Sequence, residues 1–392
     1  MFKSVLSLTL AAALGTASFG QTTLTAIPGE AAAAKYASIS QEILRAIEKG
    51  NEYLKSKQNP EGYWAQPSYP ALTALAVTAY MRDPANQGKP VPEYIRKGYD
   101  FILKSQKEDG SIFNRGMSSY NTAVCMMALL AANKEEYAPA ILKGRAYLIK
   151  QQNHFAPDNP YNGGIGYGDK QAPPIADLSN TSLALEAIYY SQKLAKDGKY
   201  GEQPDLDWNA ATEFINRCQQ NPAVNKEPWV SNDKSQLGGF VYRPGVSSAR
   251  DKKSAAFDKA EPPKAYGSMT YAGMQSLIYA NVDKNDPRVK LALKWLENSY
   301  SLDENPGMGV QGLYYYYPAM SKALSAMGID TLTLENGRKV DWRDELANKL
   351  ISIQKSDGSW VNTNNRWWEA DPVLVTSYCV LALEQLYHSI PR

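Results

Sequence analysis

The sequence predicts an all-α protein in which six helical hairpins form a closed ring, an (α/α)6 toroid. Three observations lead to this prediction. A short motif recurs along the chain, an apolar helix follows each copy after a glycine-containing turn, and no segment of useful length alternates like a half-buried strand. A single hairpin leaves a hydrophobic face uncovered, whereas a ring lets every inner helix bury both flanks.

The recurring motif marks the end of the first helix of each hairpin. An aromatic residue and an aliphatic residue stand side by side, and a glutamine follows four residues after the aliphatic one, as in Tyr53, Leu54 and Gln58. The fifth copy has Tyr300 where glutamine is expected, and the sixth has Lys349 at the aromatic position. The copies end at Gln58, Gln106, Gln152, Gln219, Tyr300 and Gln354.

A second helix is predicted after each turn. These segments are apolar almost all round, which predicts burial on both sides, whereas the first helix of each hairpin carries Lys and Glu on an outer stripe. Five of them begin near a threonine, and Ser321 takes its place in the fifth hairpin. The predicted second helices cover residues 71–80, 121–132, 179–190, 268–280, 318–327 and 373–386.

The first residues have the pattern of a secretory signal peptide. Lys3 precedes a short apolar run at residues 5–14, and small residues follow up to Gln21. The run is too short to span a membrane, and no other stretch of spanning length lacks charge or proline. We therefore expect a signal peptide at 1–20, an N-terminal linker at 21–42, one toroid domain at 43–392, and an exported protein without a transmembrane segment.

The composition excludes several classes of function. The chain has 42 Lys and Arg against 40 Asp and Glu, so its charge provides no general attraction to nucleic acid. Two His and three Cys are too few for a closed zinc site of the usual kind or for a disulfide scaffold. We expect Cys125, Cys218 and Cys379 to be small buried residues, with their disulfide status open. No metal and no cofactor is expected.

The repeat resembles the QW motif of squalene-hopene cyclases and related terpene cyclases. The segment from Lys49 to Trp64 matches that motif at every position, and Lys97 to Gln106 matches it nearly as well. The resemblance extends over residues 43–386 and implies the terpenoid cyclase and protein prenyltransferase toroid superfamily, more narrowly the bacterial prenyltransferase and squalene oxidase repeat proteins. An amide both donates and accepts hydrogen bonds, so each glutamine is expected to connect a helix end to a neighbouring turn.

The catalytic motif of that superfamily is degenerate here. Cyclases that protonate an alkene carry Asp-x-Asp-Asp-Thr-Ala at the start of an inner helix, and the matching segment begins at Asp177. Ser179 occupies the position of the protonating aspartate and Asn180 that of its neighbour, so we expect no ordinary squalene cyclisation. The prenyltransferase zinc site requires Asp, Cys and His, and neither His154 nor His388 has matching partners.

Candidate site residues are expected where the inner helices begin. In a ring, these starts converge on one mouth of a central cavity, to which helix N-termini bring free N–H groups. Asp177 is the candidate catalytic residue. Aspartate and threonine at such positions also act as plain helix caps, and this alternative remains open. The candidate ligand-binding residues are Tyr120, Asn180, Tyr266, Tyr271, Trp368, Glu369 and Asp371.

Three functions remain open at this point. The first is an exported toroid that binds an apolar or amphipathic ligand, or a protein partner, after loss of cyclase chemistry. The second is a non-standard terpene cyclase that uses Asp177 or another carboxylate. The third is a carbohydrate-active hydrolase or lyase, which needs two carboxylates, here Asp177 with Glu369 or Asp371. The ligand would accordingly be isoprenoid-like or a glycan, and the oligomeric state is open.

Overall fold

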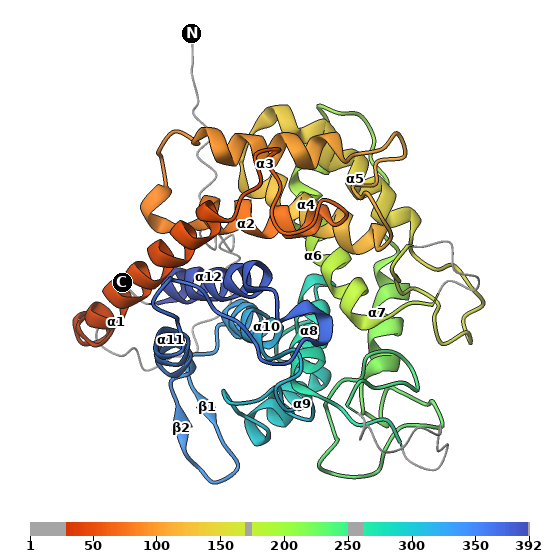
Figure 1. The fold of residues 1–392 in the computed structure, drawn as a ribbon. Helices are drawn as coiled ribbons and strands as arrows, with labels where there is room; N and C mark the ends of the chain where they lie inside the picture. The colour runs from red at the N-terminus through yellow and green to blue at the C-terminus, as the bar shows by residue number, and fades with distance from the viewer. Residues whose placement is uncertain (1–28, 169–174, 250–261, 391–392) are drawn as a thin grey trace.

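A computed structural model describes residues 29–168, 175–249 and 262–390, and it shows a ring of helical hairpins. Six outer helices surround six inner helices in these segments, as Figure 1 shows. The outer helices are α1 (Gly29–Ser56), α3 (Glu93–Lys104), α5 (Ala138–Lys150), α7 (Trp208–Cys218), α9 (Pro287–Asn298) and α11 (Trp342–Ser352). The inner helices are α2 (Pro70–Arg82), α4 (Ser118–Ala131), α6 (Leu178–Lys196), α8 (Gly267–Tyr279), α10 (Leu313–Met327) and α12 (Pro372–Ser389).

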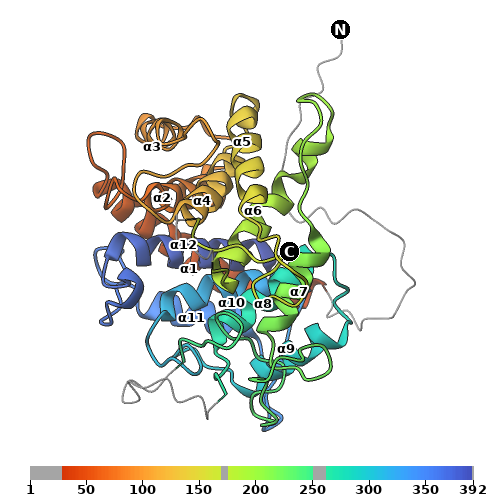
Figure 2. The same cartoon turned by 90° about the vertical axis from the view of Figure 1, so that its right-hand side faces the viewer.

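The ring is closed by packing between inner helices. Each inner helix contacts the inner helix before it and the one after it, and α12 packs against α2. The view in Figure 2 shows α3 and α5 outside α2 and α4. The remaining elements are three short 3-10 segments and a small antiparallel hairpin: η1 (Pro84–Asn86), η2 (Glu135–Tyr137), η3 (Arg366–Trp368), β1 (Leu332–Thr333) and β2 (Lys339–Val340). The prediction of an all-α toroid is confirmed.

The motif glutamines occupy equivalent corners of the ring. Nε2 of Gln58 donates to the carbonyl of Gly62 in its own turn, at 2.9 Å, and to that of Tyr94 in the next outer helix, at 2.7 Å. Gln106, Gln152 and Gln219 make the same pair of bonds, one within the turn and one to the following unit. Gln354 completes the pattern, because its amide reaches the carbonyl of Ala46 in α1 at 3.0 Å and so joins the last unit to the first.

The threonines connect each inner helix to the glycine turn before it. Oγ1 of Thr73 accepts the backbone N–H of Trp64 at 3.0 Å, and four further units repeat this bond. The fifth unit differs from the prediction. Helix α10 begins at Leu313, five residues earlier than expected, so Ser321 lies well inside the helix and donates to the carbonyl of Pro318. It therefore does not take the place of the threonine.

The turns need glycine because their backbone lies against the next outer helix. Gly110 has φ of +90°, and a Cβ atom there would lie 2.2 Å from the carbonyl oxygen of Lys143. Gly358 stands in the same relation to Lys49, with φ of +87° and a distance of 2.3 Å. No side chain fits at such a distance, and L residues avoid this backbone region.

The N-terminal segment differs from the expected linker. Residues 1–28, which include the expected signal peptide, lie outside the described residues, but residues 29–42 form the first half of α1. Tyr36 and Ile39 are buried, and the hydroxyl of Tyr36 donates to Asp341 at 2.5 Å. The apolar residues at 36, 39 and 43 recur at helical spacing, so this stretch packs as a continuation of the helix.

Candidate functional site

Five of the six described inner helices, all except α8, keep accessible surface on one stripe among otherwise buried neighbours. The backs of these helices face outer helices and their flanks face inner neighbours, so the remaining stripe faces the axis of the ring. On α6, Ser179 and Leu183 are partly exposed whereas residues 180–182 are buried. The partly exposed residues of these stripes are Leu75, Tyr120, Met127, Ser179, Leu183, Tyr315, Lys322 and Tyr378. We call them the axial residues.

Contacts across the ring place these side chains at the axis. Helices α6 and α10 are separated by α8, yet Ser179 lies close enough to Tyr315 to affect its pKa. In the same way, Tyr120 of α4 interacts with Tyr378 of α12 across α2. Burial raises the pKa of Tyr120, Tyr315 and Tyr378 above the ordinary value for tyrosine although all three retain accessible surface. These three side chains are therefore largely surrounded by protein although each keeps some accessible surface.

An ion pair crosses the axis further along the same helices. Nζ of Lys322 lies 2.8 and 3.0 Å from the two carboxylate oxygens of Glu186. Glu186 follows Ser179 by seven residues and Lys322 follows Tyr315 by seven, so two helical turns separate this pair from Ser179 and Tyr315 at the mouth. Along the axis, the side chains thus change from aromatic at the mouth to apolar at Leu183 and to a charged pair beyond it.

Asp177 is buried at the mouth and caps α6. Its Oδ1 accepts the backbone N–H of Asn180 at 2.9 Å, and its Oδ2 accepts the side-chain amide of Asn180 at 2.8 Å. Desolvation raises its pKa to about 6, although hydrogen bonds from Asn180 and Tyr242 and the charge of Arg243 act in the opposite direction. Ser179, two residues on, holds the axial position, and the carboxyl group of Asp177 is engaged with its own helix.

Tyr266 and Tyr120 share this mouth with Asp177. Tyr266 precedes α8 and is 3% exposed. It lies close enough to Asp177 and Tyr315 for their charges to raise its pKa. Tyr120 likewise lies close enough to Tyr315 to raise its pKa. The structure thus brings together four of the predicted site residues, namely Asp177, Asn180, Tyr120 and Tyr266.

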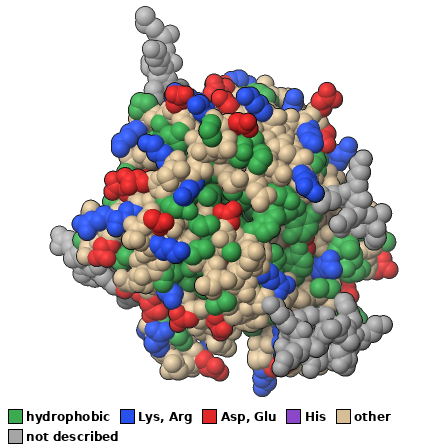
Figure 3. Space-filling model, in the orientation of Figure 1, with side chains coloured by type: hydrophobic (Ala, Val, Ile, Leu, Met, Phe, Trp, Pro, Cys, Tyr) green, Lys and Arg blue, Asp and Glu red, His purple; other side chains and the backbone are tan. Residues whose placement is uncertain are grey.

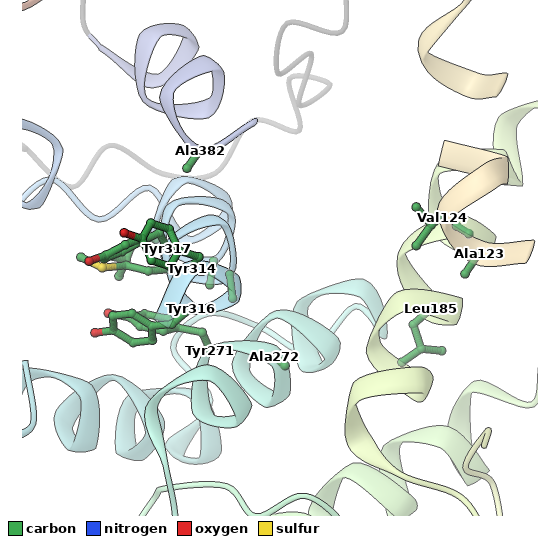
Figure 4. Packing of buried hydrophobic residues seen from close by; sticks show 14 of the residues in the cluster. Ala123, Val124, Leu185, Tyr271, Ala272, Tyr314, Tyr316, Tyr317 and Ala382 are labelled. Carbon is green, nitrogen blue, oxygen red and sulfur yellow. The ribbon is translucent and has the colours of Figure 1, made fainter. Parts of the chain in front are cut away.

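Tyr271 lies elsewhere. It is fully buried and its ring packs on that of Tyr316, with centroids 5.5 Å apart. Figure 4 shows this pair on the opposite side from Val124 and Leu185, among the tyrosines of α10. Tyr271 therefore fills the layer between α8 and α10, and the prediction that it faces a shared cavity does not match this position.

Glu369 and Asp371 act as helix caps in the structure. Glu369 is 1% exposed, and its Oε1 accepts the backbone N–H of Tyr315 at 2.8 Å at the start of α10. Asp371 accepts the N–H of Val373 at 2.8 Å and so caps its own helix, α12. Each of these two carboxylates is therefore bound to the N-terminus of an inner helix.

The N-termini of neighbouring inner helices are also occupied, which corrects the expectation of free N–H groups at the mouth. Oδ1 of Asn121 accepts the N–H of Ala71 at 3.1 Å, and Oδ1 of Asn305 accepts that of Ser268 at 2.9 Å. Each cap comes from the unit that follows, so adjacent hairpins satisfy one another's helix ends. An anion would have to displace these side chains to bind there.

Trp368 lies on the surface near the mouth. It is 40% exposed, and its ring lies 4.6 Å from that of Tyr69 at the start of α2. Trp367 beside it is 46% exposed, and both residues have positive φ. In Figure 1 the deep-blue segment before α12 lies near the centre of the view, and Figure 3 shows hydrophobic side chains gathered near the centre of the same face.

Sequence reasoning missed Tyr378, Tyr242 and the pair formed by Glu186 and Lys322. Tyr378 had a usable signal, because it follows Thr376 by two residues as Leu183 follows Thr181. Aligning the sequences of the inner helices at their threonines would have identified the positions that face the axis. Tyr242 had no such signal in the sequence, since it reaches Asp177 from the long loop before α8.

The described residues also bear on thiol chemistry, metal binding and membrane insertion. Cys125, Cys218 and Cys379 are buried free thiols. Within the described segments, no group of three or more His, Cys, Asp and Glu side chains is arranged to hold a metal ion. None of the helices in this part of the chain combines the length and the apolar composition needed to span a bilayer.

Solved structures with a similar fold are type II terpene cyclases. A variant of MstE from Scytonema in complex with its substrate geranylgeranyl dihydroxybenzoate has a TM-score of 0.54 and 10% identity, with 90% of this chain and 99% of that chain covered. The apo form of MstE has a TM-score of 0.52 and 11% identity, with coverages of 89% and 99%. No family model matches the sequence. With its closed ring of six hairpins, this chain has the terpenoid cyclase-like α/α toroid fold.

Proposed function

We propose that this protein binds an amphipathic, isoprenoid-like molecule in the axial space of the ring without cyclising it. The observation that carries this proposal is the axial stripe, which keeps accessible surface at Leu75, Met127, Leu183 and the tyrosines although the neighbouring residues of these helices are buried. Apolar and aromatic walls favour an apolar chain, because its burial removes hydrocarbon surface from water. The signal-peptide pattern at residues 1–20 supports action outside the cytoplasm.

Absence of cyclisation is inferred from the group that holds the axial position. A serine hydroxyl, which Ser179 places at the axial position, is too weak an acid to protonate an alkene. The carboxyl group of Asp177 is engaged by Asn180 on both oxygens. A ligand in the axial space would therefore meet hydroxyl groups at this level.

Binding can be measured with two defined probes, geranylgeraniol and geranylgeranyl dihydroxybenzoate. We expect both to bind in calorimetry and to be recovered unchanged by mass spectrometry. Leu183→Trp should weaken binding at least about tenfold, because the larger ring fills the axial space. Leu293→Trp is the matched control, since Leu293 is also partly exposed but lies on the outer helix α9.

Three outcomes would contradict the proposal. If neither probe binds the wild-type protein, or if both tryptophan variants bind like wild type, the axial space is not the ligand site. Recovery of a cyclised product would contradict the expectation of binding without chemistry.

A non-standard terpene cyclase is the second candidate, and one observation favours it. Burial raises the pKa of Asp177 to about 6, so part of the population carries a proton on this carboxyl group near neutral pH. Under this candidate, the probes would give a cyclised product that disappears in Asp177→Asn while binding persists. Product formation that survives this substitution would exclude Asp177 as the acid.

A further inference from the structure

The surface beside the mouth carries exposed aromatic rings on a firmly held segment. Trp367 and Trp368 are 46% and 40% exposed and have φ of +55° and +64°. Such backbone angles are unfavourable for bulky residues, so surrounding contacts must hold them. Two consecutive strained and exposed tryptophans are not explained by burial of hydrophobic surface.

The contacts that hold this segment are buried and polar. Nδ2 of Asn362 donates to Oε2 of Glu369 at 2.7 Å and to the carbonyl of Val310 at 2.7 Å. The other carboxylate oxygen of Glu369 caps α10. These bonds fix the segment on both sides of the tryptophans, so binding there would cost little ordering of the chain.

One arginine packs on an aromatic ring of this surface, and the backbone of a second arginine lies close by. The guanidinium group of Arg366 lies 4.3 Å from the ring centroid of Trp367 and donates to Gln311. The backbone N–H of Arg115 donates to the carbonyl of Ser68, so its side chain starts next to Tyr69. Among the described residues neither arginine forms an ion pair. The nearby Asp371 is occupied as the cap of α12.

We propose that Tyr69, Trp367, Trp368, Arg115 and Arg366 form a surface site that binds an acidic saccharide. Aromatic faces pack against the C–H faces of sugar rings, and guanidinium groups pair with carboxylates through charge-assisted hydrogen bonds. The exposed neighbours Thr363 and Asn365 offer further partners for sugar hydroxyls. A hydrocarbon partner fits less well, because it would remove both arginines from water without pairing them.

Tetragalacturonate tests this site, and cellotetraose is the neutral control. We expect calorimetry to detect tetragalacturonate with an affinity that falls as salt rises, and to detect cellotetraose at least about tenfold more weakly. Arg366→Gln and Trp368→Ala should each weaken tetragalacturonate binding about tenfold or more. Arg96→Gln on α3 and Trp208→Ala on α7 are matched controls that should bind like wild type.

Leu183→Trp separates this site from the axial one. The saccharide has no apolar chain, so this substitution should leave its binding unchanged even where it abolishes binding of geranylgeraniol. Circular dichroism confirms folding, and Arg366→Gln decides the test if Trp368→Ala does not fold. Absence of tetragalacturonate binding, equal affinity for cellotetraose, or wild-type affinity in Arg366→Gln would each overturn the proposal.

Discussion

Asp177→Asn is the substitution that the structure predicts in most detail. Asparagine caps a helix about as well as aspartate, so the N–H of Asn180 keeps an acceptor. The new side-chain NH2 would face Nδ2 of Asn180, so the Asn180 amide has to rotate by 180° to accept from it through Oδ1, an atom without a hydrogen-bond partner in the described residues. The substitution therefore removes a buried charge and keeps both the helix cap and one hydrogen bond between the two side chains.

The magnitude follows from the pKa of Asp177. Burial raises it from 3.8 to about 6. The folded state thus binds the proton more tightly than the unfolded state, and this group loses stabilisation as pH rises from about 4 to about 6. The cost of ionisation at neutral pH is about 3 kcal/mol. Because the variant has no such charge, we expect equal stability near pH 4 and a variant more stable by up to about 3 kcal/mol at neutral pH.

Urea unfolding of both proteins across this pH range measures the difference. Other buried carboxyl groups, such as Glu369 and Glu384, titrate in both proteins and largely cancel in the difference. Asp109→Asn is the control of opposite sign, since its hydrogen bonds with Ser111 lower the pKa of Asp109. A flat difference curve, or a variant less stable than wild type at neutral pH, would refute this account of Asp177.

Two further substitutions test the ring itself, each against a matched variant by urea unfolding. Gly110→Ala should lower the free energy of unfolding by about 3 kcal/mol or more, because a Cβ atom there would lie 2.2 Å from a backbone oxygen. Gly88→Ala, which has φ of +74° but open space around it, should lower it by about 1 kcal/mol. Equal losses in the two variants would contradict the steric explanation. Lys322→Met should cost about 3 kcal/mol by leaving Glu186 buried without its partner, and the double variant with Glu186→Gln should recover most of this loss. A double variant no more stable than the single one would show that the ion pair does not account for the loss.

The repeating corner of the ring could be predicted from the sequence because its hydrogen bonds depend on short spacings. Gln58 reaches Gly62 four residues on, and the four later copies that have a glutamine also bond a glycine of their own turn, two of them across a longer turn. The same residue type at the same position of the motif then predicted equivalent environments around a ring. The four mouth residues Asp177, Asn180, Tyr120 and Tyr266 could be placed for the same reason, since each lies at the start of an inner helix.

The partners of the remaining side chains were decided by the tertiary structure. Glu186 and Lys322 stand 136 positions apart, and they meet because two non-adjacent helices turn the same stripe to the axis. Glu369 binds the N–H of Tyr315, 54 positions earlier in the chain, because a buried carboxylate is stabilised by free N–H groups at a helix N-terminus. Tyr271 points into the layer between α8 and α10 because the rotation of α8 about its own axis directs it there. That rotation is set by packing against both neighbouring helices, and no local spacing in the chain records it.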